Sequence, residues 1–301
     1  MKNLKTILLV IVTLLILGFL FSRINFTEIR GAFSKSNKAF LLFIHLLPFF
    51  ITGLLALRWM AVLKLFGHKS SFKKTIHVYL ASVPVSRIAP ANFGDYIKAY
   101  YMRDDIAPSK SAGGVLLEQF LDIFALLVLV IFGSLFSKNY FFFLISLTVL
   151  LLMAVFLFLL LKMEVRFLKK WQDKIDNFFS AFKKFFRDKN AFCILAFTFL
   201  AWLVMLIYVK GLFFAFGFNI PFGVILAFQP IVTLISLIPV TFSGIGAREA
   251  VMIYFYSAFA PASSILAVAL IYSFFAAILF PAICLPFAYK MFRKSKGTKS
   301  L

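Results

Sequence analysis

The chain has 301 residues, of which 63% are hydrophobic and 43 are phenylalanine, and its mean hydropathy is +0.99. Too few polar side chains remain to cover a soluble globule of this length, so the composition predicts a polytopic membrane protein. The formal net charge is +21, but the basic residues lie in short stretches between apolar runs, where positive charge usually sets membrane orientation. We therefore expect no nucleic-acid partner.

Apolar runs long enough to cross a hydrocarbon core of about 30 Å predict six full transmembrane helices. They are residues 4–21, 39–63, 112–136, 140–161, 191–216 and 262–289. The first run resembles a signal sequence, but no small-x-small cleavage site follows it, so we expect a retained span. We expect residues 1–301 to form a single integral domain, because no stretch between the spans is long enough for a core of its own.

Two further apolar segments are interrupted by proline, glycine and charge. Residues 78–101 contain Pro84, Pro90, Gly94 and Asp95. Residues 224–256 contain Pro230, Pro239, Gly244, Gly246, Arg248 and Glu249. A matched pair of such breaks is typical of a transport site, since open backbone and charge at membrane depth need protein or water around them. We expect two re-entrant helical hairpins, broken at Pro90, Gly94, Pro239, Gly244 and Gly246.

The basic residues predict how these hairpins are oriented. If the amino terminus is cytoplasmic, most of the 32 lysines and arginines lie in stretches that face the cytoplasm: residues 2–5, 64–74, 103–110, 162–189 and 290–299. This bias satisfies the positive-inside rule only if each interrupted segment enters and leaves the membrane on one side. The first hairpin would then open to the cytoplasm and the second to the exterior, as an inverted repeat, with both termini cytoplasmic.

Residues 164–190 predict an amphipathic helix on the inner leaflet surface. Apolar side chains recur there at every third or fourth position, with lysines between them. We expect this helix to anchor through apolar burial and attraction to anionic lipid. A role in gathering substrate or binding a partner stays open.

Four acids in apolar or interrupted segments are candidate site residues, because ionisable groups at membrane depth usually serve function. They are Asp95, Glu118, Asp122 and Glu249. Glu118 and Asp122 stand four residues apart on one helical face. They would either face a substrate or pair with Lys98 or Arg87 and hold the first hairpin in place.

Basic side chains next to the breaks indicate an anionic ligand. Lys98 follows Gly94 and Asp95 at the start of a helix, where a phosphate headgroup would be attracted. In the second segment Arg248 can bind phosphate through two N–H groups, while Glu249 can hold that arginine or accept an ammonium group. We find no metal-ligand spacing and no nucleotide-binding or nucleophile motif, so we expect no metal, no cofactor and no enzymatic activity.

Two strings of residues carry a family resemblance. Residues 89–95 (APANFGD), followed by Lys98, Glu118 and Asp122, and residues 238–250 (IPVTFSGIGAREA) resemble the membrane domain of lysylphosphatidylglycerol synthase, the flippase-like family. The second string holds the more specific pattern, Pro-x-x-x-x-Gly-x-Gly-x-Arg-Glu. The resemblance covers nearly the whole chain and implies a multi-pass protein of a bacterial or archaeal cytoplasmic membrane.

The residues and the resemblance together favour a lipid flippase or scramblase. Its substrate would be a phospholipid or a polyprenyl-linked lipid. The charged residues would bind the anionic or phosphate-bearing headgroup of that lipid. The alternative is a membrane component or partner of a lipid-modifying glycosyltransferase or aminoacyl-lipid synthase. The sequence does not specify an oligomeric state.

Overall fold

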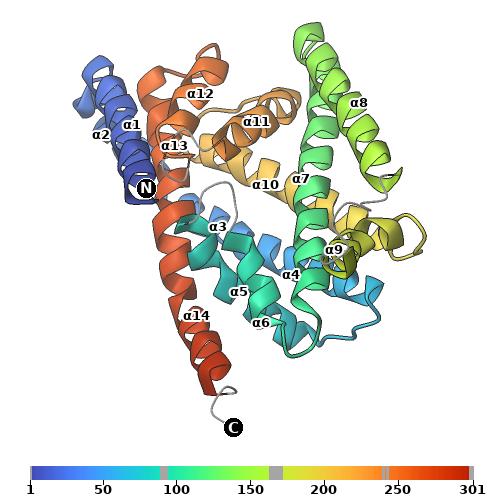
Figure 1. The fold of residues 1–301 in the computed structure, drawn as a ribbon. Coiled ribbons are helices and arrows are strands. Elements are labelled where there is room, and N and C mark those ends of the chain that lie inside the picture. The colour runs from blue at the N-terminus through green and yellow to red at the C-terminus, as the bar shows by residue number, and fades with distance from the viewer. Residues whose placement is uncertain (1, 89–93, 163–171, 239–240, 242–243, 298–301) are drawn as a thin grey trace.

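The computed structural model describes residues 2–88, 94–162, 172–238, 241 and 244–297, and all regular elements in these ranges are helices (Figure 1). Five stretches are long and apolar enough to cross a membrane. They are α3 (Lys38–Ile44) with α4 (Leu47–Leu65), α7 (Pro108–Phe136), α8 (Tyr140–Lys162), α10 (Ala191–Ala215), and α13 (Ala262–Phe274) with α14 (Phe280–Gly297). The prediction of an all-α membrane protein is therefore confirmed.

The chain bends sharply after the first predicted span, residues 4–21. Helix α1 (Lys2–Arg23) is followed by α2 (Phe26–Lys35) at an angle of 84°, and the pair counts as a sixth span if it is taken together. Asn25 caps α2, because its side-chain oxygen accepts a hydrogen bond from the backbone N–H of Thr27 at 2.9 Å. Helix α2 packs against α13, so the bend keeps this segment on the bundle.

Two shorter helix pairs occupy the interrupted segments. The first hairpin consists of α5 (Phe72–Ile88) and α6 (Ile97–Tyr101), and the second of α11 (Phe222–Leu237) and α12 (Ala247–Tyr256). Pro84 and Pro230 lie inside α5 and α11, so neither proline interrupts its helix. Inside a membrane bundle, neighbouring groups can satisfy the carbonyl that a proline leaves free. The expected breaks at Pro90 and Pro239 fall outside the described residues.

Glycines let the helices approach closely. Helix α11 packs against α7, where a Cβ added to Gly133 would overlap the backbone of Ala227. Helix α10 packs against α3 and α4, and an added Cβ on Gly211 would lie 2.5 Å from Cδ1 of Ile44. Larger residues at Gly133 or Gly211 would force these helices apart. Helix α5 packs against α14.

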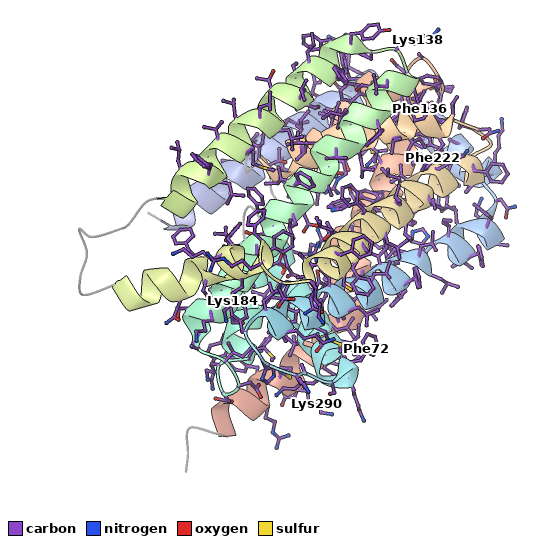
Figure 2. The ribbon with its side chains drawn as sticks, turned by 90° about the vertical axis from the view of Figure 1, so that its right-hand side faces the viewer. Phe72, Phe136, Lys138, Lys184, Phe222 and Lys290 are labelled. Atoms are coloured by element: carbon purple, nitrogen blue, oxygen red, sulfur yellow. The ribbon has the colours of Figure 1, made fainter. Side chains whose placement is uncertain are left out.

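The two hairpins begin at opposite ends of the bundle. Phe222, the first residue of α11, lies toward the end that carries Lys138 (Figure 2). Phe72, the first residue of α5, lies toward the end that carries Lys184 and Lys290 (Figure 2).

Helix α9 (Gln172–Phe185) lies within the predicted amphipathic region 164–190, of which residues 164–171 are outside the described part. Phe182 and Phe185 are buried in a cluster with side chains of α4 and α7, whereas Lys183 and Lys184 are exposed. Much of the apolar side of α9 therefore packs on protein, and its place at the membrane surface stays a prediction.

A π-helical turn, η4 (Phe275–Leu279), joins α13 to α14. Phe275 and Phe280 stack with ring centroids 5.8 Å apart and an angle of 24° between the rings. Both side chains are buried with Val83 of α5 and Cys284. The turn therefore lies where the last span meets the first hairpin.

Candidate functional site

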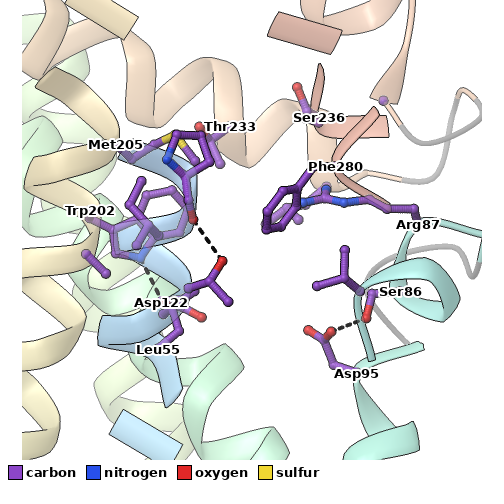
Figure 3. Close-up of a pocket in the computed structure, with 18 of the residues that line it drawn as sticks. Leu55, Ser86, Arg87, Asp95, Asp122, Trp202, Met205, Thr233, Ser236 and Phe280 are labelled. Atoms are coloured by element: carbon purple, nitrogen blue, oxygen red, sulfur yellow. Dashed lines mark hydrogen bonds between the residues drawn. The ribbon is translucent and has the colours of Figure 1, made fainter. Parts of the chain in front are cut away.

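A cavity of about 280 Å³ lies between the two hairpins and the spans (Figure 3). Its polar lining comes from both hairpins and from α4, α7, α10 and α13: Thr52, Arg58, Tyr79, Ser82, Ser86, Arg87, Asp95, Asp122, Trp202, Tyr208, Thr233, Ser236, Thr241, Arg248 and Tyr272. Few apolar bundles enclose so many polar groups without a use for them, so this cavity is the candidate ligand site.

Arg58 of α4 connects the two carboxylates that the sequence places on one face of α7. Its Nε donates to Glu118 Oε1 at 3.0 Å, and its Nη1 and Nη2 donate to the two oxygens of Asp122 at 2.6 and 3.2 Å. Trp202 of α10 also donates to Asp122, from Nε1 at 2.9 Å. Because a two-pronged arginine–carboxylate pair fixes both angle and distance, this network sets α4, α7 and α10 relative to one another.

Lys98 of the first hairpin extends this network behind the cavity wall. Its Nζ donates to Glu118 Oε2 at 2.7 Å and lies 5.0 Å from a ring centroid of Trp59 and 4.7 Å from that of Tyr79. Only 2% of Lys98 and 1% of Glu118 are exposed. Lys98 thus ties α6 to α7, which is the hairpin-holding role that the sequence left open, although Arg58 rather than Arg87 supplies the second cation.

Asp95 lies at the tip of the first hairpin and faces the cavity (Figure 3). The Ser86 hydroxyl donates a hydrogen bond to Asp95 Oδ1. The residue before it must be glycine, because a Cβ on Gly94 would overlap Ser86 Cα and the carbonyl oxygen of Val85. This close contact with α5 holds the Asp95 carboxylate beside Ser86.

Glu249 fixes the turn that starts α12 in the second hairpin. Its Oε2 accepts a hydrogen bond from the backbone N–H of Gly246 at 2.5 Å, and its Oε1 accepts one from the Ser273 hydroxyl. Gly244 and Gly246 have φ angles of +75° and +88°, which glycine adopts without strain. Glu249 is fully buried, so it acts as a helix cap within the wall.

Arg248 is the basic residue of the second hairpin that lines the cavity. Its Nη1 donates to Ser273 Oγ at 2.9 Å, and its guanidinium carbon lies 4.9 Å from the ring centroid of Tyr272. These contacts hold the side chain along α13 and use one of its five N–H donors. No hydrogen bond from its other donors to a described residue accompanies this one.

The structure thus divides the predicted site residues into two groups. Three of them line the cavity: Asp95, Asp122 and Arg248. Three others lie in the wall behind the described lining: Lys98, Glu118 and Glu249. Their parts in substrate binding stay predictions, and their structural contacts are those given above.

Arg58 and Arg87 also line the cavity. The sequence marks both as functional candidates, because each is a charge in an apolar or interrupted segment, but it does not assign either to the headgroup site. The pattern does not show which helix the charge faces. Arg58 meets partners 60 and 64 residues away, and only the packing of α4 on α7 reveals them.

Comparison with known proteins supports the membrane assignment. The family model described as the lysylphosphatidylglycerol synthase TM region matches residues 6–284. A UPF0104 membrane protein of Methanothermobacter thermautotrophicus is 24% identical, over 84% of this chain and 85% of the relative. A UPF0104 membrane protein of Methanocaldococcus jannaschii is also 24% identical, over 85% of each chain.

Proposed function

Because the chain belongs to the lysylphosphatidylglycerol synthase transmembrane family, we propose that it moves a phospholipid or a polyprenyl-linked lipid across the cytoplasmic membrane. The observation that carries this proposal is the cavity between the hairpins, where charged side chains gather inside a bundle of apolar spans. Charge at membrane depth costs free energy and commonly marks the path of a polar substrate group. A lipid headgroup is such a group.

We further infer that the two halves form an inverted repeat, whose alternate opening would expose the cavity to each leaflet. Three pairs of residues, each 150 positions apart, support it: Gly67 and Gly217, Ser86 and Ser236, and Gly94 and Gly244. The first pair ends α4 and α10 with φ angles of +78° and +85°. The other two pairs correspond in their contacts: Gly94 approaches the turn that holds Ser86, and Gly244 approaches the turn that holds Ser236. The opposite starting points of α5 and α11 agree with the inverted relation (Figure 2).

The basic residues support an orientation for this arrangement. Lys184 and Lys290 lie toward the end of the bundle at which α5 begins (Figure 2). Lysine and arginine collect on the cytoplasmic side of membrane proteins. The first hairpin would therefore enter from the cytoplasm, the second from the exterior, and both termini would be cytoplasmic.

Headgroup translocation in proteoliposomes tests the proposal. We expect the wild-type protein to move labelled phosphatidylglycerol or a labelled polyprenyl phosphate without a nucleotide. Asp95→Asn should slow this movement about tenfold or more, the effect of losing one charged hydrogen bond in the site. The matched control is Asp105→Asn, because Asp105 pairs with the exposed Lys74 outside the cavity.

Folded wild-type protein that moves neither lipid would contradict the transport proposal. Co-purification of a soluble glycosyltransferase or aminoacyltransferase with the tagged chain would then favour the alternative, a membrane partner of a lipid-modifying enzyme. Equal translocation rates for Asp95→Asn and Asp105→Asn would remove Asp95 from the path and leave the transport proposal in place.

A further inference from the structure

The cations in and behind the lining of the cavity fall into two classes. Arg58 and Lys98 are neutralised by the two carboxylates of α7, with N–O distances between 2.6 and 3.0 Å. Arg87 and Arg248, which both line the cavity, form no ion pair with any described residue. Only the second class therefore has positive charge to offer a ligand.

Among the described residues, the acids of the hairpin tips form no ion pair with these two arginines. The Asp95 carboxylate is held by the Ser86 hydroxyl, and that of Glu249 is committed to its helix cap. Of the charged groups that act on Arg87, Arg248 repels its charge and Asp95 attracts it. Two guanidinium groups that repel each other in a low-dielectric cavity favour the binding of an anion between them.

Polar atoms without hydrogen-bond partners gather in the same place. Within the described part of the chain, buried atoms of this kind that line the cavity are Arg87 Nε, Tyr208 Oη and Thr241 Oγ1. Arg87 extends from the end of α5 toward Phe280, into the space between the hairpins (Figure 3). Buried donors in native proteins almost always have acceptors, so these atoms also point to a ligand that accepts hydrogen bonds.

We propose that Arg87 and Arg248, one from each hairpin, form an anion subsite for a phosphate monoester or diester, with the Thr241 hydroxyl as a third donor. The proposal rests on the proposed function in taking a lipid headgroup as the first candidate source of the phosphate, although a soluble phosphate compound has the same chemistry. Arginine suits this role because its planar fork binds two phosphate oxygens and stays charged when buried.

The proposed subsite gives the two basic residues of the first hairpin, Arg87 and Lys98, different roles. Lys98 stands 150 positions before Arg248, yet it is neutralised by Glu118 and enclosed by aromatic rings. Arg87 therefore takes the place of Lys98 as the phosphate-binding cation of the first hairpin. A bound phosphate would be shared between the two hairpins.

Equilibrium binding to the purified full-length chain in detergent micelles tests the subsite. The probes are inorganic phosphate, phosphatidylglycerol and uncharged diacylglycerol. We expect at least one phosphate probe to bind more tightly than diacylglycerol, and Arg87→Leu to weaken its binding about 10- to 100-fold, as for the loss of a charged hydrogen bond. Leucine is the residue at the equivalent position 237. Arg87→Lys should weaken binding less, because it keeps the charge and loses the fork.

The control is Arg30→Leu, which removes an exposed arginine of α2 and should leave binding unchanged. Tight binding of phosphatidylglycerol alone supports the subsite with a lipid as the source, and equal binding of inorganic phosphate supports it with a soluble source. Wild-type affinity in both Arg87 variants overturns the proposal. The proposal is also overturned if diacylglycerol binds as tightly as the phosphate probes. Arg87-dependent binding without lipid movement would contradict the transport proposal alone.

Discussion

The two hairpins share a backbone arrangement and differ in charge. In each, a glycine packs against the helix turn that carries a serine eight residues earlier, Ser86 before Gly94 and Ser236 before Gly244. Positions of the cavity lining that are 150 residues apart carry different side chains: Arg58 and Tyr208, Arg87 and Leu237, and Asp122 and Tyr272. The hairpins therefore share their backbone packing, and at these three pairs the charge comes from the first half alone. Arg248 is the charged side chain that the second hairpin adds to the lining.

The hairpins are also held in place by different interactions. The first is tied to α7 through Lys98 and Glu118, which belong to a network of buried charges. The second is held by the Glu249 cap and by its contact with Ser273. Removing one member of a buried ion pair leaves a charge without a partner. Weakening a helix cap leaves only neutral N–H and O–H donors with a poorer acceptor. The first hairpin should therefore be the more sensitive to loss of one carboxylate.

The largest effect is expected from valine at the hairpin glycines. Gly94→Val should give no folded protein, because the side chain would overlap the backbone of α5. Gly244→Val should fold but lose about 1–3 kcal/mol, since valine is strained at φ +75° and the nearest atom, Ser236 O, is 3.0 Å away. Size-exclusion chromatography and thermal unfolding in detergent measure both. Gly53→Ala is the control, because its Cβ would meet no atom within 4 Å, and equal stability of the two valine variants would contradict the comparison.

Neutralising the acid that holds each hairpin in place, Glu118 or Glu249, should have an intermediate effect on the free energy of unfolding. Glu118→Gln should lower the free energy of unfolding by about 3–5 kcal/mol, because Arg58 and Lys98 lose their shared carboxylate. Glu249→Gln should cost about 1–3 kcal/mol, since the amide oxygen can still accept from Gly246. Unfolding of both variants in one detergent compares them. A larger loss for Glu249→Gln would show that the cap, not the charge network, is the stronger support.

The smallest effect is expected at the start of the first hairpin. Lys74 and Asp105 pair at 2.6 Å, but 40% of the Lys74 side chain is exposed. An exposed pair contributes about 0–1 kcal/mol, and salt weakens it further. Asp105→Asn should therefore change stability by less than about 1 kcal/mol, and by less still in high salt. Unfolding measured at two NaCl concentrations checks this. A loss of stability as large as that of Glu118→Gln would show that the Lys74–Asp105 pair, not the buried network, holds the first hairpin in place.

The sequence predicts the spans and the hairpin tips because their signals are local. Apolar runs give span length directly, and Gly94 and Gly244 are needed where the chain turns back against its own helix. Partners across helices could not be predicted. A spacing of four shows that Glu118 and Asp122 share a face, but it does not show that Arg58 faces them.

Two further differences have physical causes that local patterns do not express. Proline signals a break, yet Pro84 and Pro230 lie inside continuous helices. Neighbouring groups in a membrane bundle can satisfy the carbonyl that a proline leaves free. The position of Lys98 follows from Trp59 and Tyr79, which enclose its ammonium group. A rule based on helix starts alone assigns that lysine to the ligand, whereas the ring contacts and Glu118 withdraw it from the cavity.

The π-helical turn η4 explains how one span presents two aromatic rings to a single wall. In a regular α-helix, residues five apart point about 140° away from each other, because each residue turns by about 100°. The wider turn brings Phe275 and Phe280 to the same side, where they stack and both line the cavity. Deleting one residue of η4 would rotate everything after it, so that one phenylalanine, and the whole surface of α14 that meets α5, would face a different direction.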